Sequence, residues 1–176
     1  MSRSGITPLG AIARGVAAGA VGTLAMDLVW YSRYKRGGGE DRFTDWEFSA
    51  STKSFEDAGA PAQIGKRIVE GLFHTELPPE SAAFTNNVVH WATGSQWGAV
   101  YGVAAGSAAA ANPALGLLLG AAAWGTSYVV MPLAKLYKPI WEYDAKTLAK
   151  DLSAHLVFGL ATAGAFRALS RGRPSR

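Results

Sequence analysis

The sequence of 176 residues contains no cysteine. This absence excludes disulfide bonds, thiolate metal sites and a cysteine nucleophile. Only three histidines are present, and none stands in the spacing of a zinc site. Neither a nucleophile–base pair nor a phosphate-binding loop stands out either. The sequence therefore predicts no metal, no cofactor and no enzymatic activity.

Charged residues are also scarce, at 17% of the chain, and none occurs from Ser81 to Ala134. The net charge of +4 is not gathered into a basic stripe, so we do not expect the protein to bind nucleic acid. Apolar runs of about 18 or more residues without charge are typical of membrane spans. A soluble bundle with unusually buried helices is the alternative interpretation.

The apolar runs predict four membrane-spanning helices, since about 20 helical residues cross a hydrocarbon core of ~30 Å. These spans are residues 9–31, 85–107, 114–133 and 148–169. A polar loop, residues 37–80, separates the first two, and Asn112-Pro113 predicts a tight turn between the second and third. We expect one all-α domain over residues 1–176, an integral membrane four-helix bundle.

The polar loop also predicts an amphipathic helix from Pro61 to about His74. One face is apolar and carries Ile64, Ile68, Val69, Leu72 and Phe73, whereas the other carries Gln63, Lys66, Arg67 and Glu70. A helix of this pattern lies in the membrane interface or caps the bundle.

Glycines recur at the spacing of a smooth helix stripe, where another backbone can approach closely. The stripe in the second span is Gly94, Gly98, Gly102 and Gly106; the other spans carry Gly15, Gly19 and Gly22, then Gly116 and Gly120, then Gly159. This glycine-zipper pattern predicts helix contacts. We expect Gly98 and Gly102 to face the first span through Gly15 and Gly19.

The same landmarks occur twice along the chain. The first copy reads Gly22-Thr23, Tyr34-Lys35, Trp46-Glu47-Phe48, His90 and Gly94. The second copy has the corresponding residues in the same order, which are Gly125-Thr126, Tyr137-Lys138, Trp141-Glu142-Tyr143, His155 and Gly159. We hypothesise a duplicated two-helix hairpin, with the copies related by a pseudo-two-fold axis along the membrane normal. The alternative is that these residue types recur because membrane boundaries favour them.

Polar groups from four predicted spans fall at a similar depth, given the rise of the helix. This intramembrane polar layer consists of Asp27, His90, Ser127, Tyr128 and His155. One interpretation is a proton or ion relay, because ionisable groups inside a membrane are costly. A second is a structural polar cluster. A third makes His90 and His155 the two axial ligands of a haem. We expect Glu47 and Glu142, in the loops, to be solvated.

Several segments resemble a family of small bacterial inner-membrane proteins, the YagU-like family. The resemblance covers roughly Gly15–Phe166 apart from the first polar loop, and it rests on His90-Trp91, Gly98-Ala99-Val100-Tyr101-Gly102, Met131-Pro132-Leu133, Pro139-Ile140-Trp141 and His155-Leu156-Val157-Phe158-Gly159. It implies a mostly four-helix protein of the bacterial cytoplasmic membrane. It implies no activity.

The function predicted is that of a non-catalytic membrane module, either an accessory or assembly subunit of a larger membrane complex or a homo-oligomer held by glycine faces. The alternative is a small transporter or proton-relay protein that uses the polar layer. A cavity that reaches the layer favours the transporter, whereas glycine stripes left facing lipid favour the module. We expect the protein to lie in a lipid bilayer. Lys and Arg near the span ends are divided almost evenly, so the resemblance alone favours cytoplasmic termini.

Overall fold

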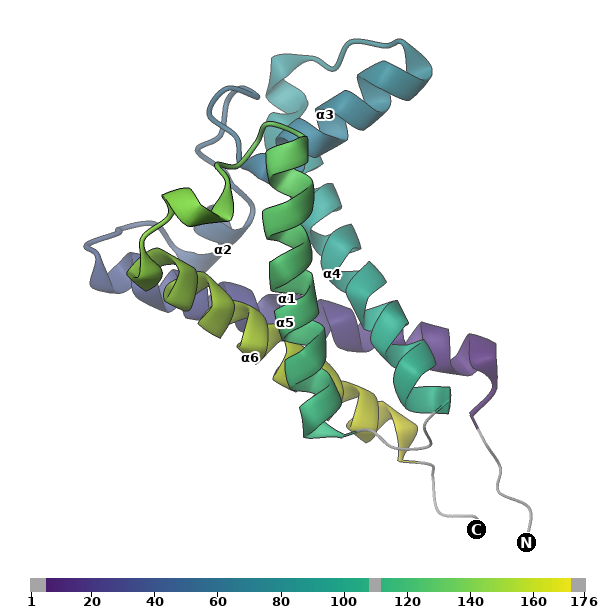
Figure 1. Ribbon diagram of the computed structural model, residues 1–176. Helices are drawn as coiled ribbons and strands as arrows, with labels where there is room; N and C mark the ends of the chain where they lie inside the picture. Colours follow the sequence, from purple (N-terminus) through teal and green to yellow (C-terminus); the bar gives the residue numbers. More distant parts are fainter. Residues whose placement is uncertain (1–5, 108–111, 172–176) are drawn as a thin grey trace, which may run out of the picture.

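The computed structural model describes residues 6–107 and 112–171, and all the secondary structure in these two ranges is helical. Four long helices dominate the fold: α1 (Pro8–Arg36), α4 (Ala82–Ser107), α5 (Pro113–Leu133) and α6 (Ala145–Ser170) (Figure 1). The first polar loop contains the short α2 (Phe43–Glu47) and the longer α3 (Ala60–Phe73). Single 3-10 turns, η1 (Pro79–Ser81) and η2 (Ile140–Glu142), precede α4 and α6.

Local sequence signals set the ends of the long helices. Thr7 caps α1 by accepting a hydrogen bond from the Gly10 amide at 3.1 Å, and Pro8 occupies the first turn, where its missing N–H costs nothing. Asp144 caps α6 by accepting from the Thr147 amide at 2.9 Å. Hydrogen bonds from the Thr147 side chain and backbone lower the pKa of the exposed Asp144 carboxyl. Each long helix contains its predicted span, and α4 and α5 end at the residues where those spans were expected to end.

Three of the described helices are long and apolar enough to cross a membrane, namely α1, α5 and α6, with mean hydropathy of 1.5, 1.5 and 1.3. The fourth predicted span, α4, is a continuous helix of 26 residues without a charged side chain. Its average is lower because Asn86, Asn87 and His90 occupy its first half. The all-helical fold is thus as expected, but three helices and not four are long and apolar enough to cross a membrane.

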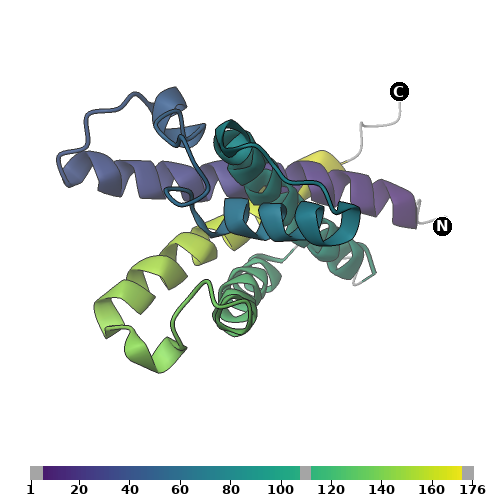
Figure 2. The same ribbon diagram turned by 90° about the horizontal axis from the view of Figure 1, so that it is seen from above.

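The long helices cross instead of running side by side. Antiparallel contacts join α1 to α4, α1 to α6, and α5 to α6, whereas α4 and α5 barely touch. Figure 1 shows α5 running steeply across α1, and Figure 2 views α5 nearly along its axis while α1 lies lengthwise. The helices therefore splay away from shared crossing points, and the arrangement is more open than a parallel four-helix bundle.

Arginines fasten the two ends of the α1–α6 pair. Arg33 donates to the Lys150 carbonyl at 2.7 Å and to the Ser153 hydroxyl at 2.8 Å. Arg14, near the other end of α1, donates to the Leu169 carbonyl at 3.1 Å. Since guanidinium groups bind carbonyls on both sides of the crossing, α6 is held to α1 at two separate points.

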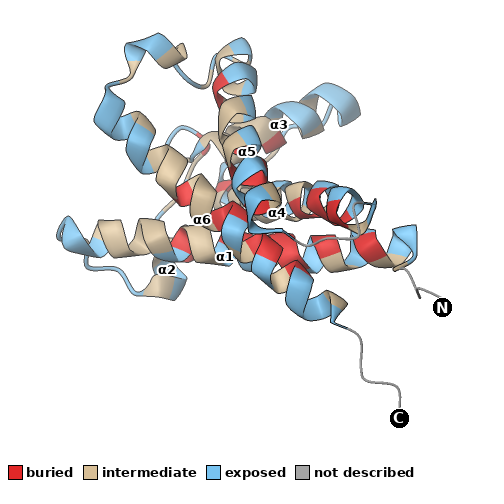
Figure 3. Ribbon diagram, turned by 60° about the horizontal axis from the view of Figure 1, so that its bottom comes forward, coloured by how far each residue is buried: buried red, intermediate tan, exposed pale blue. Residues whose placement is uncertain are grey.

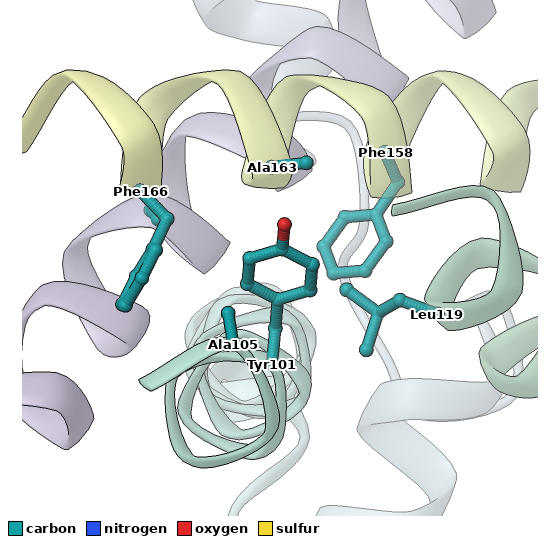
Figure 4. Close-up of a cluster of buried hydrophobic side chains, with 7 residues drawn as sticks. Tyr101, Ala105, Leu119, Phe158, Ala163 and Phe166 are labelled. Atoms are coloured by element: carbon teal, nitrogen blue, oxygen red, sulfur yellow. The ribbon is translucent and has the colours of Figure 1, made fainter. Parts of the chain in front are cut away.

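The core is small and lies where the helices cross, as the burial colours in Figure 3 show. Tyr101 of α4 is only 2% exposed and packs edge-to-face on Phe166 of α6, with ring centroids 5.5 Å apart. Phe158 and Leu119 complete this cluster (Figure 4). Many large apolar side chains elsewhere on the long helices remain exposed, including Val16, Val21, Leu24, Leu28, Val100, Val103, Leu118 and Val129. Apolar surface of this extent on the apolar helices is consistent with a lipid surrounding.

Helix α3 packs against α4 through small residues. Ala62 is fully buried, and a Cβ on Gly65 would meet the Val89 side chain at 2.9 Å. The other end of α3 leaves Leu72 71% exposed and Phe73 69% exposed. The predicted amphipathic helix is therefore present, with one part packed on α4 and its C-terminal apolar residues largely exposed.

The helix pairs match the proposed duplication only in part. Each predicted hairpin is formed, α1 with α4 and α5 with α6. A two-fold axis relating the hairpins would also make the α1–α6 and α4–α5 contacts equivalent. The α1–α6 contact is extensive and the α4–α5 contact is slight, so the arrangement departs from two-fold symmetry.

Candidate functional site

Asp27 of α1 and His90 of α4 form a hydrogen-bonded ion pair at one end of the α1–α4 crossing. The His90 Nε2 lies 3.0 Å from Asp27 Oδ2 and 3.1 Å from Oδ1. Asp27 is only 5% exposed. A carboxylate in such a position requires a partner, and the imidazole supplies it.

Glycine contacts bring these two helices close enough for the pair to form. A Cβ on Gly19 would lie 2.9 Å from the Gly98 Cα, and one on Gly15 would lie 3.0 Å from the Gly102 Cα. Because the helices are antiparallel, Asp27 lies two turns beyond Gly19 at the level of His90, one turn before Gly94. The predicted partners Gly98, Gly102, Gly15 and Gly19 thus lie together.

The remaining predicted glycines are placed at other helix contacts or beside them. Gly22 lies against Phe158 and Thr162 of α6, Gly94 against Thr23, and Gly106 against Ala11. Gly116 and Gly120 of α5 face Gly159 and His155 of α6.

Glu47 joins the pair from the polar loop, contrary to the prediction that it is solvated. The short helix α2 carries it into the site, where it is 8% exposed, and its Oε1 has no hydrogen-bond partner among the described residues. Burial and the nearby Asp27 together raise the pKa of Glu47 to about 7, and His90 opposes part of the shift. The neighbouring Trp91 indole N–H is likewise buried without a partner. Glu142, its counterpart in the repeat, is exposed as expected.

His155 has a different partner from His90. Its Nδ1 lies 3.0 Å from the Asp151 carbonyl and 3.3 Å from the Asp151 Oδ1, both on its own helix. Burial raises the pKa of the neighbouring Tyr137 hydroxyl, and Asp151 and Tyr143 add to the shift. Tyr128 is buried and also lies near Asp151. The predicted layer is therefore divided into an Asp27–His90 part and a His155–Asp151 part.

Two cavities adjoin these groups. The first, the inner cavity, has about 170 Å³ and lies between α1, α3, α4, α5 and α6. Both His90 and His155 line it, together with Ser127. The second, the loop-side cavity, has about 280 Å³ and is lined by Asp27 of α1 and by residues of α2, the polar loop and α4, namely Trp46, Glu47, Ser49, Gly59, Asn86 and His90. Among the described lining residues, His90 alone borders both.

The hydrogen bonds of the two histidines leave the haem interpretation open. The His90 Nε2 is bonded to Asp27, and His155 uses its Nδ1 within α6. Each imidazole has a second nitrogen, and an axial ligand needs only one, so this interpretation stays a prediction. Within residues 6–107 and 112–171, no three His, Asp or Glu side chains are arranged to hold a metal ion.

Aromatic clusters close the loop-side ends of both hairpins. In the first, Tyr31 packs on Phe43 and Trp46 with centroids 5.2 and 5.5 Å away. In the second, Tyr128 packs on Tyr143 at 5.4 Å and on Tyr137 at 5.9 Å. The first cluster joins the end of α1 to the polar loop that follows it, and the second joins the end of α5 to the loop before α6. This similarity agrees with the repeated landmarks.

Comparison with protein-family models, with curated proteins and with solved structures finds no match for this chain. The resemblance to the YagU-like family stays a prediction.

Proposed function

We propose that this protein is a multi-pass membrane protein that transfers protons through the cluster of Asp27, Glu47 and His90, as a proton relay or as the proton-handling part of a small transporter. The observation that carries the proposal is the position of His90, whose imidazole borders both cavities and is bonded to Asp27. An imidazole has two nitrogens, so a proton taken up on one can leave from the other.

The chemistry of the cluster suits exchange near neutral pH. Glu47 has a pKa of about 7 and therefore gains and loses a proton with little bias. It lines the loop-side cavity with Asp27 and His90, so all three groups can exchange a proton with that cavity. Ser127 and His155 also line the inner cavity, so a proton released by His90 enters a space that has other polar groups on its walls.

The alternative of an assembly module held by glycine faces has less support. The stripes of α1, α4 and α5 are filled by contacts within the chain, and of the described glycines in the long helices only Gly125 and Gly164 face open space. The exposed end of α3 remains as a surface for another protein or for lipid. We assign it to the bilayer interface, because an apolar face opposite Lys66 and Arg67 is typical of interfacial helices.

We further propose α4 as the fourth span, in a bacterial cytoplasmic membrane with cytoplasmic termini. The lack of charge along α4, its antiparallel packing on α1 and its exposed Val100 and Val103 support the span. Cysteines introduced at Ser175 and Ser51 test the orientation with a membrane-impermeant thiol reagent on intact cells. Labelling at Ser51 with protection at Ser175 is expected, and the reverse pattern contradicts the orientation.

Proton flux in liposomes tests the function itself. Purified protein is reconstituted, a pH gradient is imposed with the membrane potential clamped, and decay of the gradient is followed with an internal dye. We expect the wild type and His74→Asn to accelerate the decay and His90→Gln to match empty liposomes. His74 is the control because it is exposed and lies outside the cluster, and Asn tolerates its left-handed backbone, φ 53°. Equal rates in all three proteins contradict the proposal.

A further inference from the structure

The inner cavity has walls of aromatic and sulfur-containing side chains. Trp97 and Phe158 contribute rings, and Met26 and Met131 contribute thioethers. Its volume of about 170 Å³ is similar to the ~150 Å³ of a buried cavity that accepts one benzene ring. The space therefore suits a molecule built on a single ring, and methionine allows the walls to adapt to it.

Three hydroxyls on the same walls can act only as hydrogen-bond acceptors toward the cavity. The Thr23, Thr93 and Ser127 hydroxyls each donate to a carbonyl one turn earlier in their own helices, at 3.0, 2.7 and 3.0 Å. Each hydroxyl thus keeps only its lone pairs for the cavity. A ligand that carries several N–H donors can therefore bond to these hydroxyls.

The charge around the cavity also selects the sign of the ligand. None of the described residues that line it is Lys or Arg. Each lining histidine has a carboxylate beside it, Asp27 for His90 and Asp151 for His155, so a protonated imidazole adds no net positive charge. Aromatic faces attract cations by a further ~0.5–2 kcal/mol in general.

We propose that this cavity binds a small aromatic ammonium ion, a ligand class with one ring, one positive charge and three N–H donors. The inference rests on the proposed function, since exchange of the ammonium ion for a proton at His90 makes the protein a proton-coupled amine transporter. No bond to carbon forms or breaks, and only a proton and the intact cation change places.

Calorimetric titration of the detergent-solubilised protein tests the site, with empty micelles as the blank. The probes are benzylammonium, benzyl alcohol and benzoate, which share the ring and differ in charge and donors. We expect benzylammonium to bind at least ~tenfold more tightly than either of the others. Ser127→Ala removes an acceptor without adding bulk to the wall, so it weakens benzylammonium about fivefold. Thr126→Val, one residue away and exposed, leaves the affinity unchanged.

Trp97→Leu removes a ring from the wall and lowers the affinity about tenfold, with thermal unfolding measured alongside to verify folding. Equal binding of the three probes, or no binding by a folded wild-type protein, overturns the inference. If proton flux depends on His90 but benzylammonium does not bind, the inference fails and the proposed function stands. If benzylammonium binds with the stated selectivity and no proton flux occurs, the site stands and the proposed function fails.

Discussion

The two helical hairpins carry the same landmarks, yet their histidines lie in different surroundings. In the α1–α4 hairpin, His90 pairs with a carboxylate from another helix, and a second acid, Glu47, is buried beside it. In the α5–α6 hairpin, His155 pairs with Asp151 one turn earlier in the same helix, and Glu142 is exposed. Part of the difference comes from the first polar loop, in which α2 carries Glu47 inward. The rest comes from α1, whose Asp27 supplies the carboxylate that pairs with His90.

The largest expected effect concerns the helix contacts themselves. Gly98→Leu forces a side chain into the backbone of α1 at Gly15 and Gly19, and we expect it to lower the free energy of unfolding by ~3 kcal/mol or more. Gly120→Leu tests the corresponding contact in the second hairpin, where the His155 backbone is the obstacle. Gly164→Leu is the matched control, because no atom lies near its added Cβ. Melting in detergent measures all three, and an unchanged Gly98→Leu variant contradicts the packing.

The second effect compares the two acid partners. Asp27→Ala leaves His90 without its carboxylate, and loss of one member of a buried pair costs ~3 kcal/mol. Asp151→Ala costs less than ~1 kcal/mol, since its side chain is 21% exposed and its backbone carbonyl still bonds to His155 Nδ1. Chemical unfolding of both variants measures the difference. Equal losses contradict the distinction between the hairpins.

Glu47 makes the stability of the folded protein depend on pH, whereas Glu142 does not. The folded state raises the pKa of Glu47 from 4.5 to about 7, so the folded protein binds more protons than the unfolded chain between these values. Its contribution to stability is present below about pH 4.5 and is lost as the pH rises to about 7. Glu47→Gln removes this slope, and Glu142→Gln keeps it. Melting temperatures from about pH 5 to about pH 8 decide between these outcomes, and an unchanged slope in Glu47→Gln contradicts the burial of a titrating Glu47.

The smallest expected effect separates two threonines at equivalent positions in the repeat. Thr23 is fully buried and donates to the Gly19 carbonyl at 3.0 Å, whereas Thr126 is exposed. Thr23→Val loses about 1 kcal/mol of stability and Thr126→Val loses none that melting can resolve. A similar loss in both would show that the two hairpins bury this position alike.

Sequence patterns predicted the helices well and the site less completely. Apolar runs, Asn112-Pro113 and the amphipathic pattern after Pro61 depend on local chemistry, so the helices form close to where they were expected. The polar character of the α4 N-terminal half explains why only three helices reach the apolarity of a span. The steep crossing of α1 and α5 depends on tertiary packing, and spacing along one helix does not encode it.

Asp27 and His90 were recognisable because each interrupts an apolar helix. Glu47 was missed, since an acid in a polar loop normally faces water. The aromatic residues on both sides of it, Trp46 and Phe48, were the available signal, but Trp141 and Tyr143 flank the exposed Glu142 in the same way. Only the path of the chain through α2 distinguishes these two acids, and that path depends on contacts far apart in sequence.

The central claim is that His90, and not His155, controls proton passage. It is tested most directly by proton flux in liposomes of His90→Gln and His155→Gln, measured side by side at equal protein content. The two substitutions remove the same imidazole from two walls of one cavity. The account predicts that His90→Gln falls to the rate of empty liposomes while His155→Gln keeps most of the wild-type rate. Loss of flux in His155→Gln with retention in His90→Gln, or equal rates in both, would contradict it.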